Sequence, residues 1–246
     1  MRILLVNVNT TVAATEAMVD VARHGVHAGT DVVGLTPSFG SAGVDSNVQS
    51  LLAAVGVLDA VMSYGEPYDA VVLGGFGEHG REGLVELLEV PVVDITEASV
   101  HVAMLLGRTF SIVTTLARSV SQIEDRLLLA GLRERCASVR PVGLSTRELD
   151  LDGAAAAVVA AARSAVDDGA EVIVLGCGGL AGLADQVSQA IGVPVVDPVM
   201  TGVVLAESLV RLGLRTSTVG SCAPPDLGDT RPWPPGASLR PPMTDH

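Results

Sequence analysis

The stretch Val172-Ile173-Val174-Leu175-Gly176-Cys177-Gly178-Gly179-Leu180-Ala181 decides the fold class of this chain. An apolar, β-branched run ends in small residues and precedes a helix-like stretch, which predicts a buried parallel strand, a tight turn and a helix start. Cys177 falls in the turn, at the carboxyl end of the strand, where open α/β sheets bind ligands. Backbone N–H groups and a helix dipole would stabilise a thiolate there. A lone cysteine is more commonly a small buried hydrophobe.

An internal repeat extends this unit to the whole chain, with a period of about a hundred residues, far longer than that of a solenoid. Val71-Val72-Leu73-Gly74-Gly75 leads through a short helix to Val90-Pro91-Val92-Val93-Asp94. In the same way, Ile173-Val174-Leu175-Gly176-Cys177 leads to Val193-Pro194-Val195-Val196-Asp197. The repeat predicts two pseudo-symmetric α/β lobes, each a mainly parallel sheet flanked by helices, with a cleft between them as the active site.

The predicted domains are residues 1–97 plus 199–214 for the first lobe and 98–198 for the second. Residues 215–246 contain seven of the thirteen prolines and show no hydrophobic periodicity. This composition predicts a disordered or surface-draped tail. Among the helices, Ser46 is a predicted N-cap of a long amphipathic helix, and Ser121 with Glu124 predicts a capping box.

Composition limits the function classes. Of the 246 residues, 48% are apolar and only 2% aromatic, so aliphatic side chains must fill the core. The formal charge of −13 argues against a nucleic-acid partner. The three cysteines, Cys136, Cys177 and Cys222, are too widely spaced for a disulfide framework or a zinc site, which favours a reducing compartment. The apolar start of the chain is too short for a signal peptide, so we expect a cytoplasmic protein.

With these motifs the chain resembles the aspartate/glutamate/hydantoin racemase superfamily, and most closely its hydantoin racemase branch, over about residues 1–214. Leu175-Gly176-Cys177-Gly178-Gly179-Leu180-Ala181-Gly182 matches the family's L-G-C-[AG]-G-[ML]-A-G turn. Asn7-Val8-Asn9-Thr10-Thr11 stands where the family has N-P-N-T-[ST], and Phe110 to Ser119 matches its second-lobe strand and threonine turn. The resemblance implies two similar lobes, no cofactor, and two cysteines acting as acid and base at a carbon next to a carbonyl.

One position departs from the family pattern. The family's first catalytic cysteine lies in a turn like A-C-F-G-D-P-G, and here the matching residues are Gly74-Gly75-Phe76-Gly77-Glu78-His79-Gly80. Gly75 therefore stands where the first thiol should be. Cys136, near the start of a strand, and Cys222, in the tail, do not replace it. His79, or a bound water, is the candidate for the missing acid or base.

The predicted site combines these residues. Cys177 is the acid/base, and enolate stabilisation is assigned to glycine-rich turns and short polar side chains. The candidate substrate-binding residues are Asn9, Thr10, Thr114, Thr115, Phe76 and Gly178. Taken by themselves, Asn9, Thr10, Thr114 and Thr115 are better explained as turn and cap residues. No cofactor or metal is called for, and the expected partner is a small carbonyl or carboxylate compound, with homo-oligomerisation open and no membrane.

Three functions remain open from the sequence. The first is a cofactor-independent racemase of a hydantoin or amino-acid derivative, with Cys177 and a second group on the opposite face. The second is a single-cysteine decarboxylase or other lyase that resembles arylmalonate decarboxylase, in which Cys177 protonates one face of an enolate. The third is a small-molecule binding protein without turnover.

Overall fold

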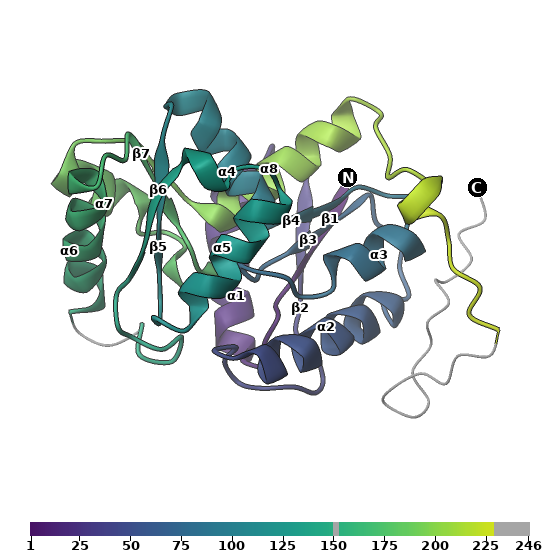
Figure 1. Cartoon of the computed structure of the whole chain (residues 1–246). Coiled ribbons are helices and arrows are strands. Elements are labelled where there is room, and N and C mark those ends of the chain that lie inside the picture. Colours follow the sequence, from purple (N-terminus) through teal and green to yellow (C-terminus); the bar gives the residue numbers. More distant parts are fainter. Residues whose placement is uncertain (150–152, 229–246) are drawn as a thin grey trace. The chain divides into compact units, whose positions relative to one another are not determined.

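A computed structural model describes residues 1–149 and 153–228 of the chain (Figure 1). The chain divides into two compact units. Among the described residues, the first comprises 1–74, 78–94 and 203–228, and the second comprises 75–77 and 95–202. Within the described ranges, no helix combines the length and apolar character that crossing a membrane requires.

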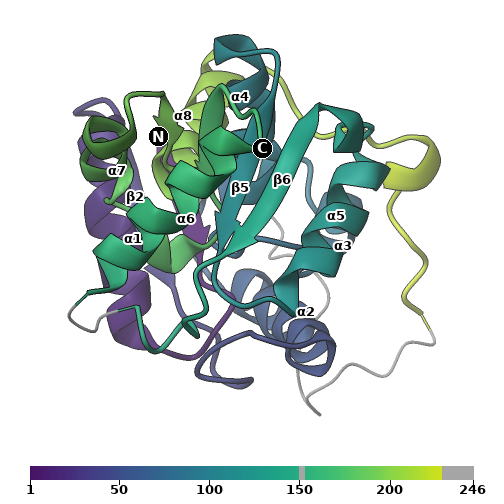
Figure 2. The same cartoon turned by 60° about the vertical axis from the view of Figure 1, so that its left-hand side comes forward.

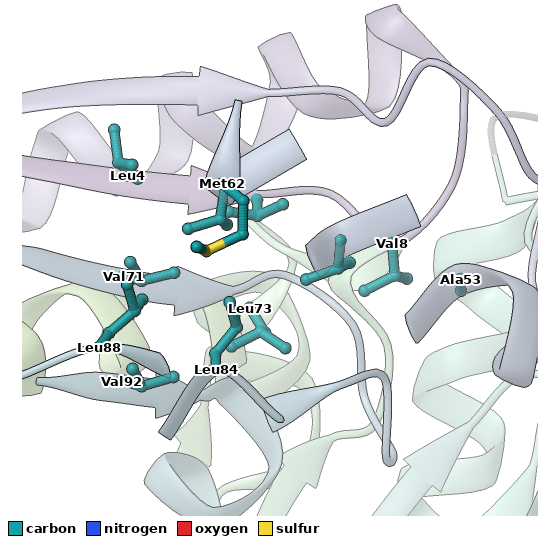
Figure 3. Packing of buried hydrophobic residues seen from close by; sticks show 12 residues of the cluster. Leu4, Val8, Ala53, Met62, Val71, Leu73, Leu84, Leu88 and Val92 are labelled. Atoms are coloured by element: carbon teal, nitrogen blue, oxygen red, sulfur yellow. The ribbon is translucent and has the colours of Figure 1, made fainter. Parts of the chain in front are cut away.

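The first unit alternates strands and helices around a four-stranded sheet. Its elements are β1 (Arg2–Val6), α1 (Val12–Gly25), β2 (Asp31–Leu35), α2 (Asn47–Met62), β3 (Ala70–Leu73), α3 (Arg81–Leu87) and β4 (Val92–Asp94). The strand order is β2-β1-β3-β4, and the pairs are parallel. β1 and β3 are buried almost throughout, which explains their continuous apolar sequences. Residues of α2 and α3 pack on one face of these strands, as Figure 3 shows for Met62 and Leu84.

The second unit repeats this order. Its elements are α4 (Ile95–Leu106), β5 (Phe110–Thr114), α5 (Ser119–Leu129), a 3-10 helix (Arg133–Arg135), β6 (Cys136–Pro141), α6 (Ala154–Asp167), β7 (Val172–Leu175), a 3-10 helix (Gly178–Leu180), α7 (Ala184–Ile191) and β8 (Val195–Val196). The parallel sheet has the order β6-β5-β7-β8. α4 and α5 pack on one face of it and α6 and α7 on the other, a layering visible in Figures 1 and 2. The predicted pair of α/β lobes with mainly parallel sheets is therefore confirmed.

α8 (Pro198–Arg211) follows β8, and the described part of the predicted tail, residues 215–228, comes after it. Thr216 donates its backbone N–H to the carbonyl of Glu89 at 2.9 Å and its hydroxyl to the carbonyl of Val90 at 2.6 Å. A 3-10 helix, Gly220–Cys222, then packs near α3. The tail predicted from composition is thus attached to the first unit through its described part, and residues 229–246 lie outside the described residues.

Two local predictions differ from the structure. The predicted capping box at Ser121 is wrong because α5 begins at Ser119: backbone turns from Leu116 and Ala117 have already made the chain helical. The helix predicted directly after Cys177 is also displaced. A single 3-10 turn follows the cysteine, and α7 begins only at Ala184, because Gly182 adopts a φ of +85° between them. The N-cap at Ser46 is confirmed, with its hydroxyl accepting from the N–H of Gln49.

Candidate active site

Cys177 lies immediately beyond β7, and the preceding glycine brings it there. The N–H of Gly176 bonds the carbonyl of Val113 at 2.7 Å, which continues the β5–β7 ladder by one residue. A Cβ on Gly176 would lie 2.5 Å from the Ile112 methyl and 3.1 Å from the Val113 carbonyl oxygen. Only glycine therefore allows the backbone to run this close to β5. Cys177 itself is extended and partly exposed, at the carboxyl end of the strand.

The backbone after Cys177 folds back onto the sulfur. The N–H of Gly179 donates to Sγ at 3.4 Å, and the N–H of Leu180 donates to the Cys177 carbonyl at 3.0 Å. A donor aimed at sulfur favours the thiolate over the thiol, which is the form that acts as a base. The sequence predicted a helix directly after Cys177, whose dipole would stabilise a thiolate. Only a three-residue 3-10 helix follows the cysteine, so this dipole is smaller than expected. The Gly179 hydrogen bond is one local stabilisation of the thiolate in the turn.

Thr114 and Thr115 end β5 beside this turn. Both are buried, and the Thr114 hydroxyl donates to the carbonyl of Gly176 at 3.3 Å. Their own carbonyls accept from Val142 and Gly143, at 2.8 and 2.9 Å. The structure therefore brings Thr114 to the residue before Cys177, as expected for parallel strands that end at the same edge.

Asp197 is a contact of this turn to which the sequence analysis gave no role. It follows β8, is 9% exposed, and accepts the N–H of Gly182 on Oδ2 at 2.6 Å. The V-P-V-V-D motif was recognised as part of the repeat, but only the fold shows that its aspartate reaches the loop after Cys177.

Asn9 and Thr10 form a polar turn after β1 in the first unit. Asn9 Oδ1 accepts from the N–H of Thr11 at 2.9 Å and from Asn7 Nδ2 at 3.0 Å. Asn7, which is 1% exposed and absent from the predicted site, also donates to the Thr15 hydroxyl and to the Thr11 carbonyl. Thr10 donates its N–H to the carbonyl of Ser41. These hydrogen bonds stabilise the turn itself, and Asn7 makes more of them than Asn9 or Thr10.

The turn Gly75-Phe76-Gly77 clusters with the second unit. Gly75 is buried and is not among the glycines with positive φ in the described chain, while Gly77 has a φ of +130°. Phe76 packs against the apolar cluster under α4 and α5. The N–H of Gly77 donates to the hydroxyl of Thr96, a buried residue of the first turn of α4, at 2.8 Å.

His79 is 6% exposed and is oriented by Ser50 of α2. The Ser50 hydroxyl donates to the carbonyl of Glu78 at 2.8 Å, so its oxygen accepts from His79 Nδ1–H, 3.1 Å away. In the neutral ring, this hydrogen bond favours the tautomer with its proton on Nδ1.

The other two cysteines differ from Cys177. Cys136 is 5% exposed, and burial raises the pKa of its thiol to about 11, with the Arg133 charge acting weakly in the opposite direction. Cys222 borders a cavity of about 410 Å³ between α3 and residues 218–228, which no predicted site residue lines. Neither Cys136 nor Cys222 is part of the turn that contains Cys177.

Comparison with known proteins shows which family this chain belongs to. The model of the Asp/Glu/hydantoin racemase family matches residues 3–206, most of the chain. This chain belongs to the Asp/Glu/hydantoin racemase family. Among characterised members of the family, the hydantoin racemase of Paenarthrobacter aurescens is 38% identical over 230 residues, covering 92% of this chain and 98% of that protein.

Solved structures of family members agree. The allantoin racemase of Pseudomonas fluorescens is 56% identical, covers 92% of this chain and 97% of its own, and superposes with a TM-score of 0.90. The allantoin racemase of Klebsiella pneumoniae is 36% identical, over 92% of this chain and 94% of its own, with a TM-score of 0.89. Arylmalonate decarboxylase shares the fold at 16% identity and a TM-score of 0.55.

Proposed function

We propose that this protein is a cofactor-independent racemase of a hydantoin-type ring, with Cys177 moving the proton at the carbon next to the ring carbonyl. The family and its homologues make it a racemase of the Asp/Glu/hydantoin type. The observation that supports the catalytic residue is the partly exposed Cys177 thiol at the end of β7, with the Gly179 N–H directed at its sulfur. Because two allantoin racemases are similar over nine-tenths of the chain, allantoin is the first substrate to test.

The chemistry needs a base, a proton donor and stabilisation of an enolate. The Cys177 thiolate removes the proton, and its thiol returns one after the carbon has become planar. Negative charge on the carbonyl oxygen is stabilised by N–H groups of the glycine-rich turn at Gly178 and by polar groups at Thr114 and Thr115. Asn9, Thr10 and Phe76 complete the proposed substrate contacts.

Inversion also needs a proton on the other face, and Gly75 has no side chain to supply one. We assign this role to the imidazole of His79, which follows Gly75 by four residues in the same turn region. A water molecule is the alternative carrier. His79→Gln keeps a hydrogen-bonding side chain but cannot exchange a proton, so it should slow racemisation while leaving proton removal by Cys177 measurable.

The deciding experiment measures proton exchange at the ring carbon and racemisation in the same sample. Enantiopure allantoin and a 5-substituted hydantoin are incubated in D₂O; proton NMR records exchange at the ring carbon, and circular dichroism records loss of optical activity. Wild type should exchange and racemise, and Cys177→Ala should lose at least about 100-fold in both rates. Cys136→Ala is the matched control and should retain activity. Full activity in Cys177→Ala would refute the assignment.

The absence of a thiol at position 75 favours one competing function, a single-cysteine decarboxylase. A substituted malonate in the same NMR assay tests it: release of CO₂ with formation of one enantiomer would replace the racemase proposal. No exchange with any of the three compounds, in a protein that binds them, would indicate a binding protein.

The cellular setting is also proposed. Cys136, Cys177 and Cys222 all lie in the described part of the chain, and none of the three forms a disulfide there. A thiolate base requires a reducing compartment, so we propose the cytoplasm. The proposed partner is a small substrate, with homo-oligomerisation open and without nucleic acid, since the net charge is −13. Fractionation with a tagged chain tests the location.

A further inference from the structure

The carboxylate of Asp197 joins two parts of the second unit. Oδ1 accepts the N–H groups of Val199 and Met200, both at 3.0 Å, which is the geometry of an aspartate N-cap on α8. Oδ2 accepts the N–H of Gly182 at 2.6 Å. The N-cap uses one oxygen only, so the second oxygen performs a separate task at the loop that follows Cys177.

Gly182 is the far end of a hydrogen-bonded segment that starts at Cys177. The N–H of Leu180 bonds the Cys177 carbonyl, and the N–H of Ala181 bonds the Gly178 carbonyl at 3.2 Å. β7 fixes one end of this segment through Gly176, and Asp197 fixes the other. Without the second anchor, Gly179 and its neighbouring glycines leave the chain many alternative conformations.

The first copy of the repeat holds its own turn through a different residue. There the N–H of Gly77, in the turn that contains Gly75, bonds the hydroxyl of Thr96 at 2.8 Å. Thr96 and Asp197 both lie at the N-terminus of the helix that follows the next strand, α4 and α8 respectively. In the repeat Asp94 corresponds to Asp197, so the anchor of Gly182 by Asp197 is a feature of the second unit alone among the described contacts.

We propose that Asp197 is a positioning residue of the racemase: through Gly182 it holds the Cys177 turn so that Sγ and the Gly179 N–H stay aligned. This inference rests on the proposed role of Cys177. Asp197 does not contact the substrate; it restricts the turn to the one conformation in which the sulfur is hydrogen-bonded. Such restriction raises the rate of proton transfer without strengthening substrate binding, because misplacement of a reacting group costs rate steeply.

The two tasks of Asp197 can be separated by substitution. Serine is an N-cap as good as aspartate, but it has one short oxygen and cannot also reach Gly182. In Asp197→Asn, Oδ1 can still cap α8, while the amide places a donor against the Gly182 N–H. Ser188→Ala is the matched control, since it removes a hydrogen bond in the same unit, to the Val193 carbonyl at 2.9 Å, without touching the Cys177 turn.

We expect kcat for racemisation and the rate of ring-proton exchange to fall together, about 10- to 100-fold, in Asp197→Ser and Asp197→Asn. KM and the unfolding midpoint should stay close to those of Ser188→Ala. Iodoacetamide should also alkylate Cys177 several-fold more slowly, because the sulfur loses its aligned N–H donor. Wild-type kcat in a folded Asp197→Ser, or losses that merely track the unfolding midpoint in both variants, would overturn the inference. Activity in Cys177→Ala would instead refute the proposed function, so the two failures are distinct.

Discussion

Cys136 and Cys177 differ in how far water reaches the sulfur, and this difference gives a chemical test. Burial raises the pKa of Cys136 to about 11, so it remains a thiol throughout the neutral range. Cys177 is partly exposed and accepts an N–H bond. At pH 8 we expect iodoacetamide to modify Cys177 and abolish activity while Cys136 remains unmodified, as read by peptide mass spectrometry. Inactivation that follows modification of Cys136 instead would contradict the assignment.

In the proposed mechanism, Gly75 is the position at which a second thiol would act. Its φ is not positive, so the backbone accepts a side chain. In Gly75→Cys we expect faster racemisation, because a second thiol supplies the proton that His79 or water otherwise provides. Chiral chromatography of the product measures the rate, with Gly75→Ala as the control for bulk. Loss of activity in both variants would mean that the site has no room at this position. Unchanged rates in both would mean that it does not border the reacting carbon.

At the scale of elements, α8 carries a buried carboxylate in the first unit. Glu207, 3% exposed, accepts from the hydroxyl of Thr30 and, at 3.2 Å, from the N–H of His27. Burial raises the pKa of Glu207, but these hydrogen bonds and the charge of Arg211 more than offset it, so the net pKa is lowered. These contacts connect α8 to the segment between α1 and β2.

This sets the pH dependence expected for Glu207→Gln. Because the folded-state pKa is lowered, the carboxylate stabilises the fold above the unfolded value of 4.5, and the contribution disappears as the pH falls through the folded pKa. Urea unfolding should show Glu207→Gln destabilised by about 1–3 kcal/mol at pH 7. The difference from wild type should shrink below pH 4.5. A difference independent of pH would indicate packing alone.

Secondary structure was predictable from sequence where burial is continuous. Runs such as Val172–Leu175 are apolar because helices cover both faces of the sheet, and this requirement is local. The start of α7 was not predictable in the same way, because Gly182 ends the short turn by adopting a left-handed conformation. Contacts between distant residues were also missed: Ser50 and His79 are 29 positions apart, and Gly182 and Asp197 are 15 apart. No periodicity encodes such pairs, so the turn of Cys177 was predictable and its anchor was not.

At the scale of the whole chain, residues 216–228 of the tail make contacts with the first unit, and this predicts different effects for two truncations. Thr216 makes two hydrogen bonds to Glu89 and Val90, and residues 218–228 cover part of α3. Removing residues 216–246 should cost about 1–3 kcal/mol for these bonds, or roughly 5 °C in Tm. Removing only residues 229–246 retains these contacts and should leave Tm and activity unchanged in calorimetry and the racemisation assay. Equal losses for both truncations would mean that the contacts of Thr216 do not matter.

The glycines around Cys177 set the limits for laboratory evolution of this enzyme. A side chain at Gly176 would overlap a β5 methyl and a β5 carbonyl, so that codon should stay fixed in any library. A Cβ at position 179 would lie 2.9 Å from the terminal methyl of Leu149, its nearest neighbour, which a rotamer change can move away. Randomising codons 149 and 179 together would therefore place new side chains two residues from Cys177, with a compensating change at position 149, and would not force the strand that carries the thiol to move.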